Sequence, residues 1–223
     1  MDHRAALLLL ADGRLPAGGY AHSGGLEPAV AMGRVRDLAD VEDFLTGRLE
    51  TVGVVAASFA AAACHAAYRL DGARLGALEA GLDARMPSPA SRRTSRQLGR
   101  QLRRVVTTLR HDPRLELVGG EPHHPVMLGV VAAVFDVEPT GAALAVLHEA
   151  ATGVATAAVR LLALDPLAAH AVVAGLAEHL DELAAQCVSW SSQEVEALPA
   201  WGAPLLDLGA EQHVRRSGRL FAS

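Results

Sequence analysis

Helical periodicity over most of the chain, with no segment that alternates strictly between apolar and polar residues, is the feature that most limits the possible folds. Half-buried strands need that alternation, whereas amphipathic helices place apolar residues three or four positions apart. Apolar runs with helical spacing occupy residues 40–70, 91–110, 125–135, 140–164 and 165–186. We therefore expect an all-α fold, a bundle-like array of six to ten helices without significant sheet, in which residues 1–223 form a single domain.

Residues that favour helix starts precede most of these runs. Candidate caps and first-turn prolines are Asp40, Pro125, Thr140, and Asp165 with Pro166. The first long helix would continue to about Leu70, where Asp71-Gly72 ends it, and the last would continue to about Gln186. Between them, residues 83–91 are rich in helix-breaking residues and predict a connection.

The composition determines what can fill such a core. Hydrophobic residues make up 51% of the chain but aromatic residues only 4%, so alanine, leucine and valine must fill the interior and helices must approach closely. All twenty basic residues are arginine, which excludes a P-loop, a Schiff-base enzyme and a lysine general base. Cys64 and Cys187 lie in apolar helical contexts and are expected to be buried, reduced thiols.

Neither a secretion signal nor a membrane span is predicted. The apolar run at residues 5–11 is too short for a signal peptide. Residues 51–68 contain no Asp, Glu or Arg, but eight of these eighteen residues are alanine, which is more typical of a buried helix than of a membrane-spanning one. We therefore expect a soluble, cytoplasmic protein.

The stretch LPAGGYAHSGGLE, residues 15–27, concentrates helix-breaking residues near the start of a helical chain. Ser23 is placed to cap the helix that begins at GLEPAV, with Glu27 in its first turn, where a carboxylate suits the helix dipole. Tyr20 and His22 would then lie on a rigid, partly exposed loop, and such loops are often contact surfaces. The residues that would shape the turn are Pro16, Gly18, Gly19, Gly24 and Gly25.

The same stretch permits an enzymatic interpretation. AHSGG around Ser23 is close to the GxSxG nucleophile elbow, with Ala21 in place of the first glycine. That elbow joins a strand to a helix inside an α/β sheet, and no such sheet is predicted here. A hydrolase using Ser23 is therefore the weakest of three function classes, and we expect no catalytic residues.

A basic stripe lies on one side of the helix predicted at 91–110. At about 100° per residue, Leu98, Leu102, Val105, Val106 and Leu109 share one arc, and most arginines lie opposite. Nine of the twenty arginines lie between Arg85 and Arg114, with one acidic residue among them. Such asymmetry in a chain of net charge −5 indicates a partner, either an acidic protein surface or nucleic acid, or else a solvated helix face.

Glu121, His123 and His124 in EPHHP suggest metal binding at first sight. A metal site needs three or more converging ligands, and no HxH or HxxxH spacing occurs nearby. We favour a structural role for this segment, with one buried, hydrogen-bonded histidine, and expect no metal site.

Four segments, taken in order, resemble the UreF family of urease accessory proteins. They are LLLLADGRLPAGGYAHSGGLE, SRRTSRQLGRQLRR, HHPVMLGVVAAVF and LLDLGAEQHVRRSGRLFAS, and together they extend over nearly the whole chain. In the last segment Arg219, Leu220, Phe221 and Ser223 match the family pattern. Val214 and Ser217 depart from it, since the family usually has a carboxylate and an aromatic residue there.

The resemblance implies a non-enzymatic chaperone of urease metallocentre assembly that is all-helical and dimeric. It implies a bridge between a UreD/UreH-type accessory protein and a UreG-type GTPase, docked on apo-urease, with nickel as cargo, GTP bound by the partner and no cofactor of its own. The alternative, which rests on the arginine stripe and not on the resemblance, is a nucleic-acid-binding helical regulator using the Arg92–Arg110 stripe. Residues 15–27 and 205–223 are the expected interaction segments, and the expected partner-binding residues are Tyr20, His22, Ser23, Glu27, Arg96, Arg100, Arg103, His213, Arg219, Leu220 and Phe221.

Overall fold

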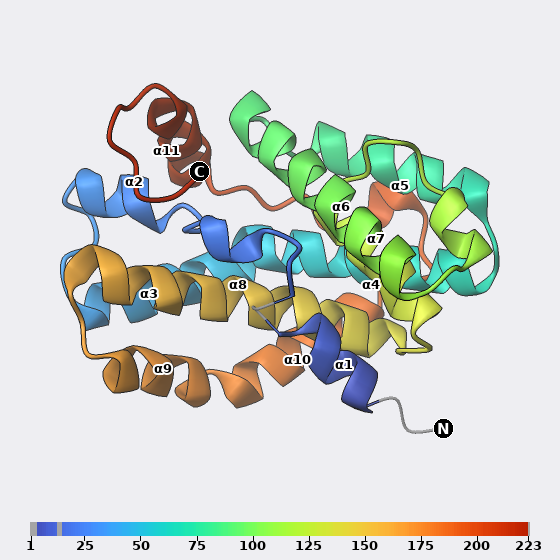
Figure 1. Cartoon of the computed structure of the whole chain (residues 1–223), viewed down its shortest axis with the longest axis horizontal. Helices are drawn as coiled ribbons and strands as arrows, with labels where there is room; N and C mark the ends of the chain where they lie inside the picture. Colours follow the sequence, from blue (N-terminus) through green and yellow to red (C-terminus); the bar gives the residue numbers. More distant parts are fainter. Residues whose placement is uncertain (1–3, 13–14, 223) are drawn as a thin grey trace.

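The computed structural model describes residues 4–12 and 15–222, and every regular element in these ranges is helical (Figure 1). Because α3 and α4 are continuous, the described residues form ten separate α-helical segments, which confirms the predicted all-α array. The α-helices are α1 (Arg4–Leu10), α2 (Leu26–Ala31), α3 (Leu38–Arg48), α4 (Val54–Tyr68), α5 (Gly72–Ala84), α6 (Pro89–Leu109), α7 (His124–Val134), α8 (Pro139–Leu162), α9 (Pro166–Gly175), α10 (Ala177–Val188) and α11 (Pro204–Val214). Short turns of 3-10 helix occur at η1 (Gly19–Ala21), η3 (Pro113–Glu116) and η4 (Val195–Ala197).

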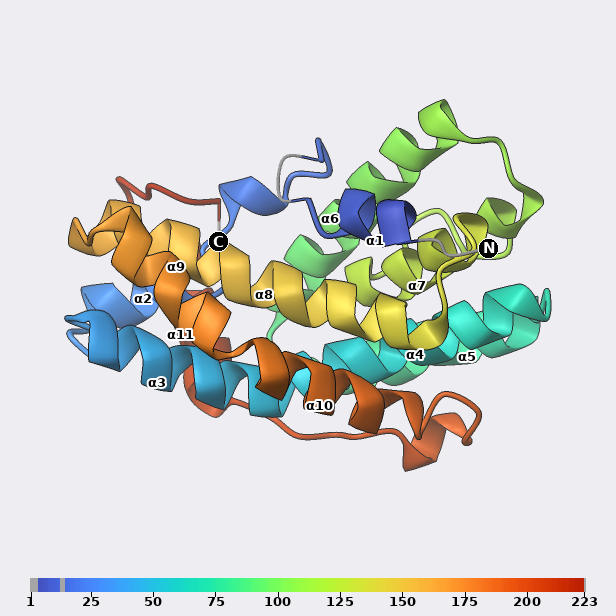
Figure 2. The same ribbon diagram turned by 90° about the horizontal axis from the view of Figure 1, so that it is seen from below.

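The central helices α4 and α8 are enclosed on two sides. Helices α9 and α10 lie along one side, and α6, α11 and the chain around α2 lie on the other (Figure 1, Figure 2). Helix α7 packs directly on α4, and α5 follows α4 antiparallel to it. The molecule therefore has two distinct outer sides that are separated by an apolar centre.

Small residues bring α4 and α7 into close contact. Ala57 and the run Phe59–Cys64 are fully buried on α4, as are most residues of α7. A Cβ atom on Gly129 of α7 would lie 2.8 Å from Ala63 Cβ and 2.9 Å from Cys64 N, closer than real Cβ contacts. The alanine-filled interior predicted from composition is thus realised by backbone-to-backbone packing.

Within residues 4–12 and 15–222, two helices have the length and composition to cross a membrane, namely the continuous helix Leu38–Tyr68 and α8. In this structure 72% and 56% of their most apolar windows are buried inside the fold. They are the central helices of the array, as predicted for residues 51–68, and their apolar character is explained by the helices that cover them.

Side-chain caps start several helices, although not always at the predicted residue. Asp165 caps α9 as predicted, accepting a hydrogen bond from Leu167 N at 3.1 Å. The first long helix is instead capped by Asp37, whose carboxylate accepts from the N–H of Asp40, so the prediction of Asp40 as the cap is wrong. Asp71 caps the following helix, α5, with its carboxylate 2.9 Å from Arg74 N.

Two further boundaries differ from the prediction. Helix α8 starts two residues earlier than expected, with Pro139 in its first turn and Glu138 at the N-cap position in place of Thr140. The helix predicted from Asp165 to Gln186 is divided at Leu176 into α9 and α10. The division follows Gly175, and glycine has a lower helix propensity than any residue except proline.

Candidate partner-binding face

The glycine loop, residues 15–27, turns sharply and closes against α8 and α11. Gly25 has φ +91°, a conformation that side chains other than glycine rarely adopt. A Cβ atom at Gly25 would lie 2.9 Å from Leu206 Cδ2 on α11, and one at Gly19 would lie 2.7 Å from Glu149 Oε1 on α8. Gly18 and Gly24 also have positive φ, and Pro16 is exposed at the start of the loop. Glycine is therefore needed both for the turn and for the close approach.

The three hydrogen-bonding side chains of this loop lie at different depths. Tyr20 is 67% exposed. His22 is half-buried, and burial together with nearby His124 lowers the pKa of its imidazole, so His22 is neutral near pH 7. Ser23 is fully buried, and its Oγ accepts a hydrogen bond from Glu27 N at 3.2 Å at the start of α2. In the isolated chain, Tyr20 is thus the part of the loop most available to another protein.

The C-terminal tail returns to the glycine loop. The Glu27 carboxylate accepts hydrogen bonds from Leu220 N at 2.9 Å and from Phe221 N at 3.0 Å. Ala222 N donates to Ala21 O at 2.7 Å, which joins the tail to the loop a second time. Sequence reasoning gave Glu27 a place in the first turn of its helix, and the structure adds that its carboxylate binds the backbone of the tail.

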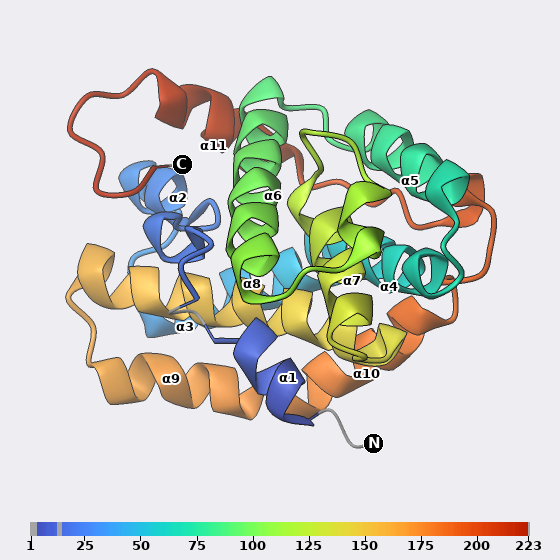
Figure 3. The ribbon, with the colours of Figure 1, turned by 45° about the vertical axis from the view of Figure 1, so that its right-hand side comes forward.

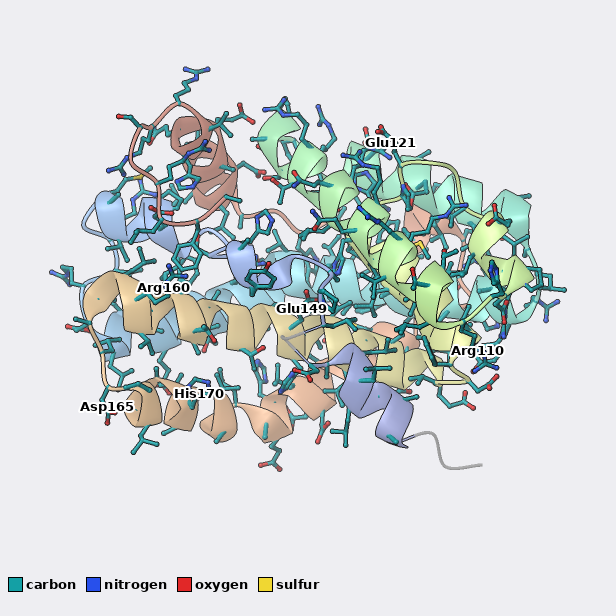
Figure 4. All side chains as sticks on the ribbon, in the orientation of Figure 1. Arg110, Glu121, Glu149, Arg160, Asp165 and His170 are labelled. Carbon is teal, nitrogen blue, oxygen red and sulfur yellow. The ribbon has the colours of Figure 1, made fainter. Side chains whose placement is uncertain are left out.

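Burial of Phe221 completes the docking of the tail. Phe221 is 5% exposed, and its ring lies beneath the guanidinium of Arg160 on α8, with Cζ 4.8 Å from the ring centroid (Arg160 is labelled in Figure 4). His213 on α11 is 1% exposed, with Nε2 3.6 Å from the Glu27 carboxylate. Leu220 remains 58% exposed and Arg219 is exposed, so the docked tail still presents two side chains outward. Ser223 lies outside the described residues.

The arginine stripe of α6 is largely paired with acidic residues of the same chain. Arg100 contacts Glu121 at 2.7 Å (Glu121 is labelled in Figure 4), and Arg103 contacts Glu116 at 3.0 Å. Arg96 donates to Asp83 at 2.6 Å and to the backbone carbonyl of Glu121. The basic charge that appears unbalanced along the sequence is therefore partly neutralised by α5 and by the connection between α6 and α7.

The apolar arc of α6 is only partly buried, and it becomes exposed at its C-terminal end. Leu102 and Val106 are buried, but Leu109 is 57% exposed. A surface groove of about 510 Å³ lies between this part of α6 and the glycine loop, lined by Pro16, Gly18, Tyr20, Gln101, Arg104, Val105, Thr108 and Leu109. The segment at 91–110 thus carries both a basic side and an unfilled apolar groove.

A buried polar network joins the second and third family-like segments, and its acidic members were not identified from the sequence. His123 is fully buried, with Nδ1 3.0 Å from Ser95 Oγ and Nε2 3.1 Å from Asp83 Oδ1. Burial and the charge of Arg96 lower the pKa of His123, and hydrogen bonding to Arg96 lowers the pKa of Asp83. A neutral imidazole therefore donates to an ionised Asp83 and accepts from the hydroxyl of Ser95.

Glu79 completes this network. Its carboxylate accepts from His123 N at 2.9 Å and lies 3.4 Å from Arg96, yet burial raises the pKa of Glu79 to about 7. The network fixes α6 to α5 and to the start of α7. Its two acids come from residues more than thirty positions before His123, so no local spacing could have revealed them.

Among the described residues, no group of three or more His, Cys, Asp and Glu side chains is arranged to hold a metal ion. His123 is occupied by the network, and His124 lies 3.5 Å from Glu149. Cys64 and Cys187 are buried, and burial raises the pKa of their thiols to about 12 and about 11. Both thiols are therefore protonated and poorly reactive near neutral pH.

These segments, distant in sequence, form one side of the molecule. The glycine loop, α6 and α11 with its tail lie next to one another, opposite α9 and α10 (Figure 3). We call this side the candidate face. It combines exposed Tyr20, Leu109 and Leu220 with the basic side of α6, which is the mixture of apolar and arginine contacts found at protein interfaces.

The family model described as UreF matches residues 35–177. Proteins named urease accessory protein UreF are similar to this chain over all 223 residues of both: 42% identical in Mycolicibacterium vanbaalenii, 43% in Mycobacterium sp. strain JLS, and 39% in Mycobacterium tuberculosis strain H37Rv. The full-length matches include the glycine loop and the C-terminal tail, which lie outside the region of the family model.

Proposed function

The chain belongs to the UreF family of urease accessory proteins, and from this premise we propose that it is a non-catalytic scaffold for nickel incorporation into apo-urease. It bridges a UreD/UreH-type accessory protein and a UreG-type GTPase. Nickel is cargo of the complex, GTP is bound by the partner GTPase, and this subunit couples GTP hydrolysis to metallocentre assembly. The scaffold is a cytoplasmic homodimer that needs no cofactor, nucleic acid or membrane.

The observation that carries the proposal is the convergence of the glycine loop, α6 and the docked tail on one face. A scaffold needs a preformed surface, since the entropy of ordering a flexible one would reduce its affinity. The tail supports this role because its backbone is held by Glu27 while Leu220 stays exposed. Arg96, Arg100 and Arg103 are paired within the chain, which favours a protein partner over the phosphates of a nucleic acid.

The test is light scattering on a size-exclusion column, with the chain alone and then mixed with its UreD/UreH-type and UreG-type partners. We expect a dimer alone and a stable larger complex with both partners. GTP hydrolysis by the partner should change when this chain joins the complex. A chain that ignores both partners would overturn the proposal.

Single substitutions locate the surface. Tyr20→Ala and Leu220→Ala remove exposed side chains of the candidate face and should weaken complex formation at least tenfold without unfolding the chain. His22→Ala should weaken it as well. Leu167→Ala is the matched control, because Leu167 is 81% exposed on α9, on the opposite side. Equal weakening by Leu167→Ala, or normal assembly by the Tyr20, His22 and Leu220 variants, would show that this face does not bind the partners.

A further inference from the structure

A second hollow, of about 310 Å³, lies between α6 and the central helices α4 and α8. The glycine loop and α11 contribute the remaining walls. Apolar side chains make up most of its lining, among them Val52, Leu82, Met86, Leu98, Val146 and Leu206. The volume is at the lower end of the range typical of small-molecule sites.

Arg48, the last residue of α3, lines this cavity without a counter-ion. Its Nε is buried and makes no hydrogen bond, and no carboxylate of the described residues lies within ion-pair distance of its guanidinium. The carboxylate whose charge acts on Arg48 is that of Glu149, but this carboxylate lies 3.5 Å from His124 Nε2 and forms its ion pair there. The side chain of Arg48 is half-buried, and burial lowers its pKa. A partly desolvated charge without a partner is destabilising, so the arrangement favours an anion.

The backbone next to Arg48 is unusual in a second respect. Residues Leu49–Gly53 form a π-helical turn in the middle of the continuous helix, and Val52 and Gly53 line the cavity. Such turns are rare in α-helices and are frequent at functional sites. Because the turn holds one extra residue, it rotates α3 by about 100° relative to α4, so Arg48 faces the cavity while the alanines of α4 stay buried.

We propose that this cavity binds a small organic monocarboxylate, with its carboxylate group on Arg48 and its short apolar part among the aliphatic side chains. The planar guanidinium suits a carboxylate because it can donate two parallel hydrogen bonds. The carboxylates of Glu149 and Asp207 also line the cavity and disfavour ligands of higher negative charge, such as a phosphate dianion. The site goes beyond the scaffold function, since binding partners at the outer face does not require it.

The test is thermal unfolding of the full chain with sodium butyrate as the probe, compared with inorganic phosphate and with sodium chloride at equal ionic strength. Ligand that binds only the folded state raises Tm by mass action. For a chain of this size we expect a rise of about 5 °C at fifty times the Kd of butyrate, and a smaller rise with phosphate.

Two variants locate the effect. Arg48→Met replaces the partly desolvated charge by an apolar chain, so Tm without butyrate should rise and the response to butyrate should disappear. Gly153→Leu fills the cavity from α8, where a Cβ atom would meet nothing within 4 Å, and should also abolish the response. Because Gly153→Leu keeps Arg48, it tests binding of butyrate in the cavity even if Arg48→Met fails to fold.

Gly47→Leu is the control for the glycine substitution. Gly47 lies on α3, has equally open space at its Cβ position and does not line the cavity, so this variant should respond to butyrate like the wild type. The proposal is overturned if butyrate leaves the wild-type Tm unchanged, if Arg48→Met or Gly153→Leu responds as the wild type does, or if phosphate stabilises the wild type as much as butyrate.

Discussion

Replacing Glu27 by Gln should release the C-terminal tail while leaving the fold intact. The Glu27 carboxylate accepts two backbone hydrogen bonds, at 2.9 and 3.0 Å, and is 13% exposed. Hydrogen bonds to a charged group contribute about 1.5–3 kcal/mol each, compared with about 0.5–1.5 kcal/mol for neutral pairs. Gln keeps one acceptor oxygen and turns an NH₂ group toward the second donor. The docked tail should therefore lose about 3 kcal/mol, roughly a 100-fold rise in its open fraction.

Amide hydrogen exchange of the peptide covering residues 215–222 measures this opening directly. We expect exchange there to quicken roughly 100-fold, because local opening sets the rate, while peptides from α4 stay protected. Glu50→Gln is the matched control, since Glu50 is a half-exposed carboxylate that contacts His179 at 3.3 Å, far from the tail. Unchanged exchange at the tail in Glu27→Gln, or an equal increase in α4, would refute the reasoning that Glu27 holds the tail locally.

Three further predictions concern the core, the buried network and a helix cap. Gly129→Ala should destabilise the chain by about 1–3 kcal/mol in urea unfolding, because the added Cβ would overlap α4. The control Gly76→Ala, in open space on α5, should stabilise the chain by up to about 1 kcal/mol. Similar urea midpoints for the two variants would contradict the close packing of α4 and α7. Burial in the folded chain raises the pKa of Glu79 to about 7, so the folded state binds the carboxyl proton of Glu79 more tightly than the unfolded state does. The resulting stabilisation is present below about pH 4.5 and is lost as the pH rises through 7. The free energy of unfolding of wild type minus that of Glu79→Gln should therefore fall between pH 5 and pH 8, and a difference that rises or stays flat would show that burial does not control this group. Asp37→Ala should lower the free energy of unfolding by about 1 kcal/mol, because it removes the hydrogen bond that Asp37 accepts from Asp40 N. Asp43→Ala, the control in the same helix, should lower it less. A larger loss for Asp43→Ala in thermal unfolding would show that Asp37 does not stabilise the start of this helix.

The helical class and most helix positions follow from the sequence because they depend on local spacing. Pro125 and Asp165 mark helix starts that the structure confirms. The cap of the first long helix was misplaced because Asp37 and Asp40 are equally good caps by residue type. Which of them has extended backbone depends on how the chain leaves α2. Leu109 was grouped with the core residues of α6, yet it is exposed, because the elements that cover α6 end before its last turns.

The site was harder to predict because its contacts join distant residues. Periodicity shows that Arg96 lies on a polar side of a helix, but not that Asp83 and the carbonyl of Glu121 receive its hydrogen bonds. Nothing local in the sequence marks Arg48, whose burial results from a π-helical turn and from packing against α8. The sequence indicates that the glycine loop and the tail are interaction segments. Their direct contact through Glu27 depends on the tertiary structure, because it joins residues at opposite ends of the chain.

Much of the buried surface of α4 consists of alanines, whose side chains have no rotamers. The alanines of α4 cannot change their χ angles, and the contact at Gly129 leaves no free volume into which α7 can move. A displacement of α6 that moves α7 is therefore transmitted across this contact as a movement of the whole α4 helix rather than as a side-chain rearrangement. The appropriate probe of such a movement is a distance between spin labels on α6 and α9, rather than the dynamics of methyl groups in the interior.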